Sequence, residues 1–162
     1  MIVVTDTSVI LNLCLLEQES LLPELFGEIC APIMVRAEFE RLSKFDSRFL
    51  GLIFPSFIEI VGIKNIPPDL QKNHKIHQGE VEAISLALER QANALLIDER
   101  AGRLVASDLG LRCMGILGIL LQAKSQDCIP SISPLIDRLG SEGGFWMSRE
   151  LRDKVLSLAG EI

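Results

Sequence analysis

The sequence lacks several features that mark large classes of protein. It has no run of about 18 uninterrupted apolar residues, so we expect no membrane span. The first residues have no basic region, and Asp6 interrupts their apolar run, which argues against a signal peptide. The four cysteines show no CxxC spacing and are interpreted as buried free thiols in a reducing cytosol. We therefore expect a cytoplasmic protein with no membrane partner.

Positive charge is also scarce. Lys and Arg number 16 against 22 Asp and Glu, which gives a net charge of −6. This balance argues against passive electrostatic coating of nucleic acid, but it is compatible with an enzyme that recruits cations to an acidic site. With 162 residues and 48% hydrophobic content, the chain predicts one domain over 1–162, with a helical tail over about 131–162. No repeat, Walker loop or GxGxxG loop is present.

Strand-like and helix-like segments alternate along the chain. Such alternation predicts an α/β fold with a parallel sheet covered by helices on both faces. The segment 64–79, with its Pro-Pro break, is interpreted as a polar loop. The expected strands are 2–5, 28–31, 57–63, 93–98 and 111–116. The expected helices are 8–18, 20–26, 32–44, 79–91, 99–110, 115–126, 133–139 and 148–160.

Two acids end apolar strands in "MIVVTD" and "NALLID". Asp6 and Asp98 therefore fall at the carboxyl ends of parallel strands, where ligands bind in open α/β sheets. Each could instead cap the helix that follows it. Both interpretations stand at this point.

Two further acids lie on apolar helix faces. At about 100° per residue, Glu80 falls among the apolar and small residues of its helix, whereas Glu82 and Ser85 fall on the polar face. Glu38 likewise lies in the apolar arc of 32–44, and Glu40 lies opposite. The alternatives are a favourable helix dipole for Glu80 and an ion pair of Glu38 with Arg41 or Arg103.

Four inward acids without a matching inward lysine or histidine would repel one another. A bound cation would relieve this repulsion, and an all-oxygen ligand set suits Mg²⁺ or Mn²⁺. Such ions activate water for attack on phosphodiesters. The pattern thus indicates a metal site built from Asp6, Glu38, Glu80 and Asp98.

The segments "VVTDTSVI", "MVRAEFERL", "GEVEAISLALE" and "LLIDERAGRLVASDLG" resemble the successive motifs of PIN-domain ribonucleases, closest to a VapC-like bacterial and archaeal subgroup. The resemblance implies a three-layer α/β/α fold with five parallel strands. It also implies a Mg²⁺- or Mn²⁺-dependent endoribonuclease, in some relatives the toxin of a toxin–antitoxin pair, and a homodimer. The family's acids fall on Asp6, Glu38, Glu80 and Asp98, with Asp6, Glu80 and Asp98 as metal ligands. Ser8 stands near the metal, and Glu99 competes with Asp98.

Other signals are weaker. His74 and His77 have a spacing that zinc could use, although a solvated loop is the preferred interpretation. Arg100 and Arg103 flank Asp98 and either contact substrate phosphates or form a surface helix face. Phe145 and Trp146 could stack bases, but docking of the last helix is preferred.

The sequence therefore predicts a metal-dependent ribonuclease acting on RNA. The alternative is an inactive module of the same fold that binds a protein or nucleic acid. A receiver domain is disfavoured, because "DT" follows the first strand where a receiver has two adjacent acids. A haloacid-type phosphatase is disfavoured, because "DTS" lacks the second Asp of DxD.

Overall fold

A five-stranded sheet, parallel throughout, lies at the centre of the structure and has the order β3-β2-β1-β4-β5. The computed structural model describes residues 1–162. The strands are β1 (Ile2–Thr5), β2 (Glu28–Pro32), β3 (Ile58–Val61), β4 (Ala94–Leu96) and β5 (Cys113–Met114). The prediction of five parallel strands is confirmed. The order also differs from the 2-1-3-4-5 order of receiver domains, which excludes that alternative.

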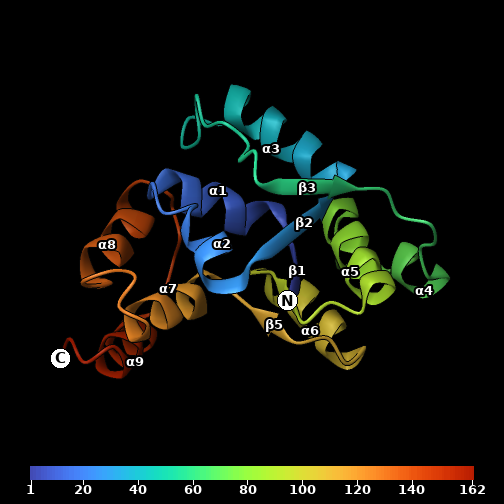
Figure 1. Ribbon diagram of the computed structural model, residues 1–162. Helices are drawn as coiled ribbons and strands as arrows, with labels where there is room; N and C mark the ends of the chain where they lie inside the picture. Colours follow the sequence, from blue (N-terminus) through green and yellow to red (C-terminus); the bar gives the residue numbers. More distant parts are fainter.

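Helices cover both faces of the sheet and complete three layers (Figure 1). In Figure 1, α1, α7 and α8 lie on one side of the central strands and α5 on the other. No helix is long and apolar enough to cross a membrane. The helices are α1 (Thr7–Leu15), α2 (Leu21–Phe26), α3 (Ile33–Phe45), α4 (Pro68–Gln71), α5 (Gln78–Arg90), α6 (Arg100–Asp108), α7 (Ile116–Ser125), α8 (Ser133–Ser141) and α9 (Arg149–Leu158).

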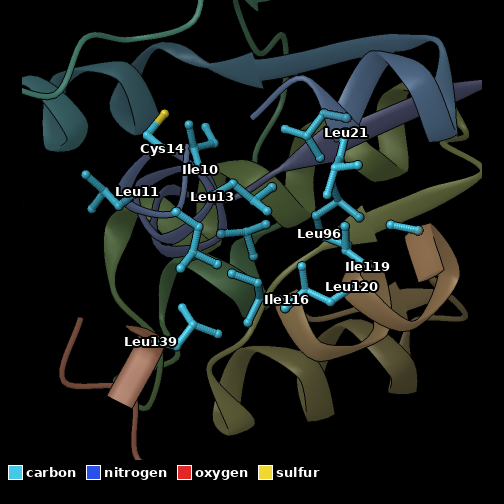
Figure 2. Packing of buried hydrophobic residues seen from close by; sticks show 14 of the residues in the cluster. Ile10, Leu11, Leu13, Cys14, Leu21, Leu96, Ile116, Ile119, Leu120 and Leu139 are labelled. Atoms are coloured by element: carbon cyan, nitrogen blue, oxygen red, sulfur yellow. The ribbon is translucent and has the colours of Figure 1, made fainter. Parts of the chain in front are cut away.

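Strand side chains alternate between two hydrophobic clusters, one on each face of the sheet. In β1, Val3 belongs to the larger cluster and Val4 to the smaller. In β4, Leu96 belongs to the larger and Leu95 to the smaller. Figure 2 shows the larger cluster, in which Leu96 packs among side chains of α1, α2 and α7. Burial on both faces explains why these strands read as continuous apolar runs.

The C-terminal helices contribute to the same larger cluster. Leu139 of α8 and Val155 of α9 are buried in it. Near the end of the chain, the carboxylate of Glu161 accepts hydrogen bonds from the backbone N–H of Ile132 at 2.8 Å and of Ser133 at 3.0 Å. The tail therefore completes the core that supports α1 and α7.

Two local predictions were wrong. The segment 64–79 contains the short helix α4, because Pro68 occupies its first position, where a missing N–H costs nothing and the fixed φ favours a helix. Leu70 of α4 is buried in the smaller cluster. Ser85 is buried and does not lie on a solvent-facing polar face. Its hydroxyl donates to the carbonyl of Val81 at 2.7 Å, so the helix itself satisfies this polar group.

Candidate metal centre

The carboxyl ends of β1 and β4 lie side by side. Thr5 pairs with Leu96, and the backbone N–H of Asp6 donates to the carbonyl of Leu96 at 2.8 Å. This register brings Asp6 and Asp98 to the same edge of the sheet. Asp6 holds the N-cap position of α1, yet its carboxylate makes no capping hydrogen bond, which disfavours the capping interpretation.

Glu80 joins this edge from the first turn of α5. Its side chain is only 3% exposed. The Oε1 atom accepts a hydrogen bond from the backbone N–H of His77 at 3.2 Å, while His77 Nδ1 accepts from the N–H of Glu80 at 3.3 Å. These two bonds form a capping box. The box fixes the start of α5, and it explains why Glu80 turns inward while Glu82 stays half-exposed.

Glu38 projects from α3 toward the sheet edge where Asp6 and Glu80 lie, and its side chain is 17% exposed. No ion pair joins Glu38 to Arg41 or Arg103. Its basic neighbour within ion-pair distance is His77, whose Nδ1 lies 3.8 Å from Oε1 of Glu38. The expectation that no histidine faces the acids was therefore wrong, because His77 lies between two of them.

Three of these side chains are close enough to share one ion. Ligand atoms of Asp6, His77 and Glu80 all lie within 4.8 Å of one another. A cavity of about 360 Å³ opens beside them. It is lined by Asp6, Thr7, Ser8, Leu11, Asn12, Glu38, Leu42, Arg48, Phe49, His77, Asp98, Glu99, Gly143, Gly144, Phe145 and Trp146. Asp6, Glu38 and Asp98 thus line one accessible hollow, whereas Glu80 is adjacent to Asp6 but does not line it.

The acids carry oxygens that no protein donor satisfies. Oδ1 of Asp6, Oε2 of Glu80 and Oδ2 of Asp98 are buried without a hydrogen-bond partner. The hydroxyl of Ser8 and the amide oxygen of Asn12 are buried and unpartnered as well. Buried polar atoms are nearly always paired, so a cluster of acceptors without protein donors is suited to binding a cation or ordered water. This oxygen-rich donor set fits a hard divalent ion.

Burial makes these acids difficult to ionise without a cation. It is the main cause that raises the pKa of Asp6 to about 7, and the neighbouring carboxylates of Glu80 and Glu38 raise it further. Burial likewise raises the pKa values of Glu80 and Glu38, which His77 counteracts. Burial raises the pKa of Asp98 to about 6. A divalent ion would favour the charged forms and reverse these shifts.

Asp98 also makes a hydrogen bond that the sequence did not indicate. Its Oδ1 accepts from the N–H of Ile116 at 2.9 Å, at the first residue of α7. The alternative that Asp98 caps the helix following it was therefore wrong, because Asp98 bonds the start of α7 and Glu99 holds the N-cap position of α6. Glu99 is exposed and lines the cavity, and its charge raises the pKa of Glu80. Both acids face the site, so the competition between Asp98 and Glu99 for a metal stays open.

The remaining candidate residues are two arginines and His74, and only Arg103 lies beside an acid of the site. Arg103 lies beside Asp98 and lowers its pKa, but it lines a separate cavity of about 510 Å³. Arg100 is exposed and lines neither cavity. His74 is exposed and lies outside the metal-binding group, so the two histidines do not form a zinc site together.

Phe145 and Trp146 differ in their burial. Phe145 packs against the larger core cluster, as docking of the tail requires. Trp146 is 84% exposed, so the docking interpretation was wrong for this residue.

Three residues were not assigned to the acidic site from the sequence, although His77 was considered as a zinc ligand. His77 stands three residues before Glu80, which is the capping-box spacing and would have placed it at the helix start. Asn12 follows Ser8 by four residues in an otherwise apolar helix, so it shares the face of Ser8. Arg48 lies in a loop, and no local pattern assigns it to the site.

Comparison with solved structures supports the fold. A PilT N-terminus domain protein from the hyperthermophilic archaeon Sulfolobus solfataricus P2 is similar, with a TM-score of 0.53 and 20% identity. The match covers 74% of this chain and 91% of that protein. At this identity the likeness concerns the fold alone. No curated protein matches the chain.

A family model matches nearly the whole sequence. The model is DUF3368, described as a PIN domain, and it covers residues 2–161. The matched range includes the sheet, the acidic edge and both C-terminal helices. The chain therefore belongs to the PIN domain family, whose members are generally nucleases that bind divalent metal ions.

Proposed function

We propose that this protein is an endoribonuclease that uses Mg²⁺ or Mn²⁺ to hydrolyse RNA phosphodiester bonds. One observation carries the proposal. Glu80 and Asp98 each commit one carboxylate oxygen to a backbone N–H and keep the other buried and unpartnered, and Asp6 also keeps one oxygen unpartnered. Acids fixed in this way are oriented by the fold yet still have oxygens free to bind a metal.

Each residue has a distinct task in this proposal. A bound divalent ion lowers the pKa of water and stabilises charge on the phosphate. Asp6 and Glu80 would hold the ion, with His77 close enough to contribute a nitrogen, and Asp98 would offer its unpartnered oxygen directly or through water. Glu38 borders both the acids and the cavity, so its carboxylate orients the attacking water and accepts its proton. Burial raises the pKa of Glu38, which suits that exchange. The hydroxyl of Ser8 supplies a further polar contact.

RNA as substrate rests on the resemblance to VapC-like ribonucleases. The test is cleavage of single-stranded RNA by the purified protein, with single-stranded DNA of the same sequence as control. Cleavage of RNA that chelation stops and added Mn²⁺ or Mg²⁺ restores is the expected result. Equal cleavage of the RNA and of the DNA would keep the nuclease assignment and remove the preference for RNA. Cleavage that survives chelation would overturn the metal-dependent account.

A second candidate function is an inactive binding module. His77 favours it, because its Nε2 lies 3.3 Å from Oε1 of Glu80 and can donate a hydrogen bond to this carboxylate without a metal. No cleavage of any RNA with any divalent ion, combined with a folded protein that binds RNA or protein, would select this candidate.

The toxin role, an antitoxin partner and the homodimer are further proposals from the resemblance, and the cytoplasmic location is a proposal from the unpaired cysteines. Growth arrest on expression, relieved by the product of an adjacent gene, tests the first two. Analytical ultracentrifugation tests the dimer, and cell fractionation tests the location.

A further inference from the structure

Trp146 is an exposed aromatic ring at the mouth of the metal-site cavity. Its side chain is 84% exposed, although large apolar side chains are usually covered. It lines the cavity that holds Asp6 and Glu38, and it also borders neighbouring cavities of about 380 Å³ and 510 Å³. Its ring therefore lies where the flanking parts of a substrate bound at the acids would pass.

The backbone around Trp146 is anchored, so the exposure of its ring belongs to the fold. The N–H of Phe145 donates to the carbonyl of Leu139 at 2.9 Å, and the ring of Phe145 packs on the larger core cluster. Gly144 has a φ of +65°, a left-handed conformation that turns the chain between Gly143, which is buried, and Phe145, which is half-buried. The chain thus holds Phe145 inward and presents Trp146 outward.

Arg48, in the loop after α3, contacts this segment directly. Its guanidinium donates to both carboxylate oxygens of Asp46, at 3.0 and 2.7 Å, and to the carbonyl of Gly143 at 3.2 Å. It also lies over the ring of Phe49, 4.8 Å from the centroid. Arg48 therefore joins the loop after α3 to the glycine pair before Trp146.

The charges of the cavity limit how it could hold a polyanion. Asp6, Glu38, Asp98 and Glu99 line it, whereas the charge of Arg48 is already paired with Asp46. Lysine and arginine contacts, which dominate most nucleic-acid binding, are therefore scarce here. Base stacking on an aromatic ring does not depend on such contacts and is worth about 5- to 100-fold in affinity per base.

We propose that Trp146 is the stacking platform for a nucleobase next to the phosphate bound at the acids, and that Arg48 is its positioning residue. This inference rests on the proposed nuclease function, because it takes a nucleic acid as the occupant. It commits to a single-stranded substrate, since a base must leave its duplex partner to stack on a side chain.

The chain offers a specific probe. Trp146 is the only tryptophan and there is no tyrosine, so tryptophan fluorescence reports on this residue alone. The experiment titrates the full chain, in Mg²⁺, with a hexamer of adenosines carrying phosphorothioate linkages that resist cleavage. The control is an abasic hexamer with the same linkages and charge. Binding of both is followed in parallel by anisotropy of a terminal dye.

We expect the adenosine hexamer to quench Trp146 saturably and to bind about 5- to 100-fold more tightly than the abasic hexamer. Trp146→Phe should keep most of this difference and Trp146→Leu should lose it. Phe45→Leu, which changes an exposed aromatic residue outside the cavity, should leave it unchanged. Arg48→Lys should weaken quenching and the preference for bases while leaving Mg²⁺ affinity intact.

Equal binding of the two hexamers, binding without quenching, or no binding of either would overturn the proposal. A blue shift of the emission on raising the protein concentration without oligonucleotide would also overturn it, because a second copy of the chain would then cover Trp146. Failure of the nuclease proposal is distinguishable: base-dependent quenching without cleavage leaves the platform standing. Metal-dependent cleavage that is indifferent to Trp146→Leu removes the platform and leaves the nuclease.

Discussion

The α-carbon of Gly79 lies directly against the carboxylate of Glu38. A Cβ atom at this position would overlap Oε1 of Glu38. Gly102 has the same relation to Oε2 of Glu80, and Gly115 to Oδ1 of Asp98. Three glycines on three elements thus let the backbone approach three acids of the site, which is a common reason for a glycine outside a turn.

This contact predicts the effect of Gly79→Ala. The clashing atom is the end of a flexible side chain, so Glu38 can rotate away while the fold persists. Alanine also favours a helix over glycine, by up to about 1 kcal/mol. We expect an unchanged or higher melting temperature together with a Mn²⁺ affinity or turnover about tenfold lower, as for other changes that disturb ligand orientation.

Gly62→Ala is the matched control for Gly79→Ala, because a Cβ at Gly62 meets nothing within 4 Å. Calorimetry measures both the melting temperature and Mn²⁺ binding. Identical Mn²⁺ affinity and turnover of the two variants would show that the position of Glu38 does not matter to the site.

Asp98 combines a structural hydrogen bond with an unpartnered oxygen, and two substitutions separate these roles. Asp98→Asn keeps an oxygen acceptor for the N–H of Ile116, so its stability should stay near that of the wild type. Asp98→Ala loses the cap of α7 and should cost about 0.5–2 kcal/mol in the free energy of unfolding. Both should weaken metal binding. If urea unfolding and metal titration show that only Asp98→Ala differs from the wild type, Asp98 is a cap and not a ligand.

The stability of the metal-free protein should depend on pH through the buried acids. Burial raises the pKa of Asp6 to about 7 and of Asp98 to about 6. From about pH 4 to pH 7 the folded chain therefore holds protons that the unfolded chain has released. The contribution of these groups to the free energy of unfolding then falls as the pH rises, by at most about 1.4 kcal/mol per pH unit for each group.

Asp6→Asn removes one of these titrations. It should flatten the decline and raise the metal-free stability at pH 8 by about 1–4 kcal/mol. Urea unfolding in chelator at pH 5, 6, 7 and 8 measures the effect, with Glu82→Gln as the control at a half-exposed acid. A variant that is less stable than the wild type at pH 8 would indicate that the Asp6 carboxylate supports the fold without a metal.

His77 offers a test of the ion. His77→Ser keeps a favoured N-cap residue for α5 and removes the imidazole near Asp6 and Glu80. Imidazole nitrogen suits transition metals better than Mg²⁺. We therefore expect Mn²⁺ affinity at pH 8 to fall more than Mg²⁺ affinity, measured by calorimetry. An equal loss for both ions, or none, would mean that His77 is not a metal ligand.

Much of the site could be predicted because its acids interrupt regular patterns. Asp6 and Asp98 end apolar strands, and parallel strands bring their carboxyl ends together. Helix periodicity placed Glu80 inward, with Glu82 facing solvent. These inferences need only local geometry and the direction of the strands.

The rest depends on contacts between distant segments. His77 lies in a polar segment with no periodicity, and its role follows from the approach of α3 and β1 to the start of α5. Arg48 contacts Gly143, 95 positions away in the sequence. Ser85 can be buried because its hydroxyl donates a hydrogen bond within its own helix. Assigning residues to a polar face by residue type alone does not predict this burial. Trp146 is exposed although its apolar character predicts burial.

The most direct test of the central claim is to compare RNA cleavage by Asp6→Ala and Glu82→Ala in saturating Mn²⁺. The first variant loses a buried carboxylate of the proposed metal site, and the second loses a half-exposed one on α5, outside the metal-binding group. Loss of a key electrostatic contact usually costs about 100-fold or more in rate. We predict a fall in kcat/KM of at least that size for Asp6→Ala and a change of less than about threefold for Glu82→Ala. Equal rates for the two folded variants would contradict the account.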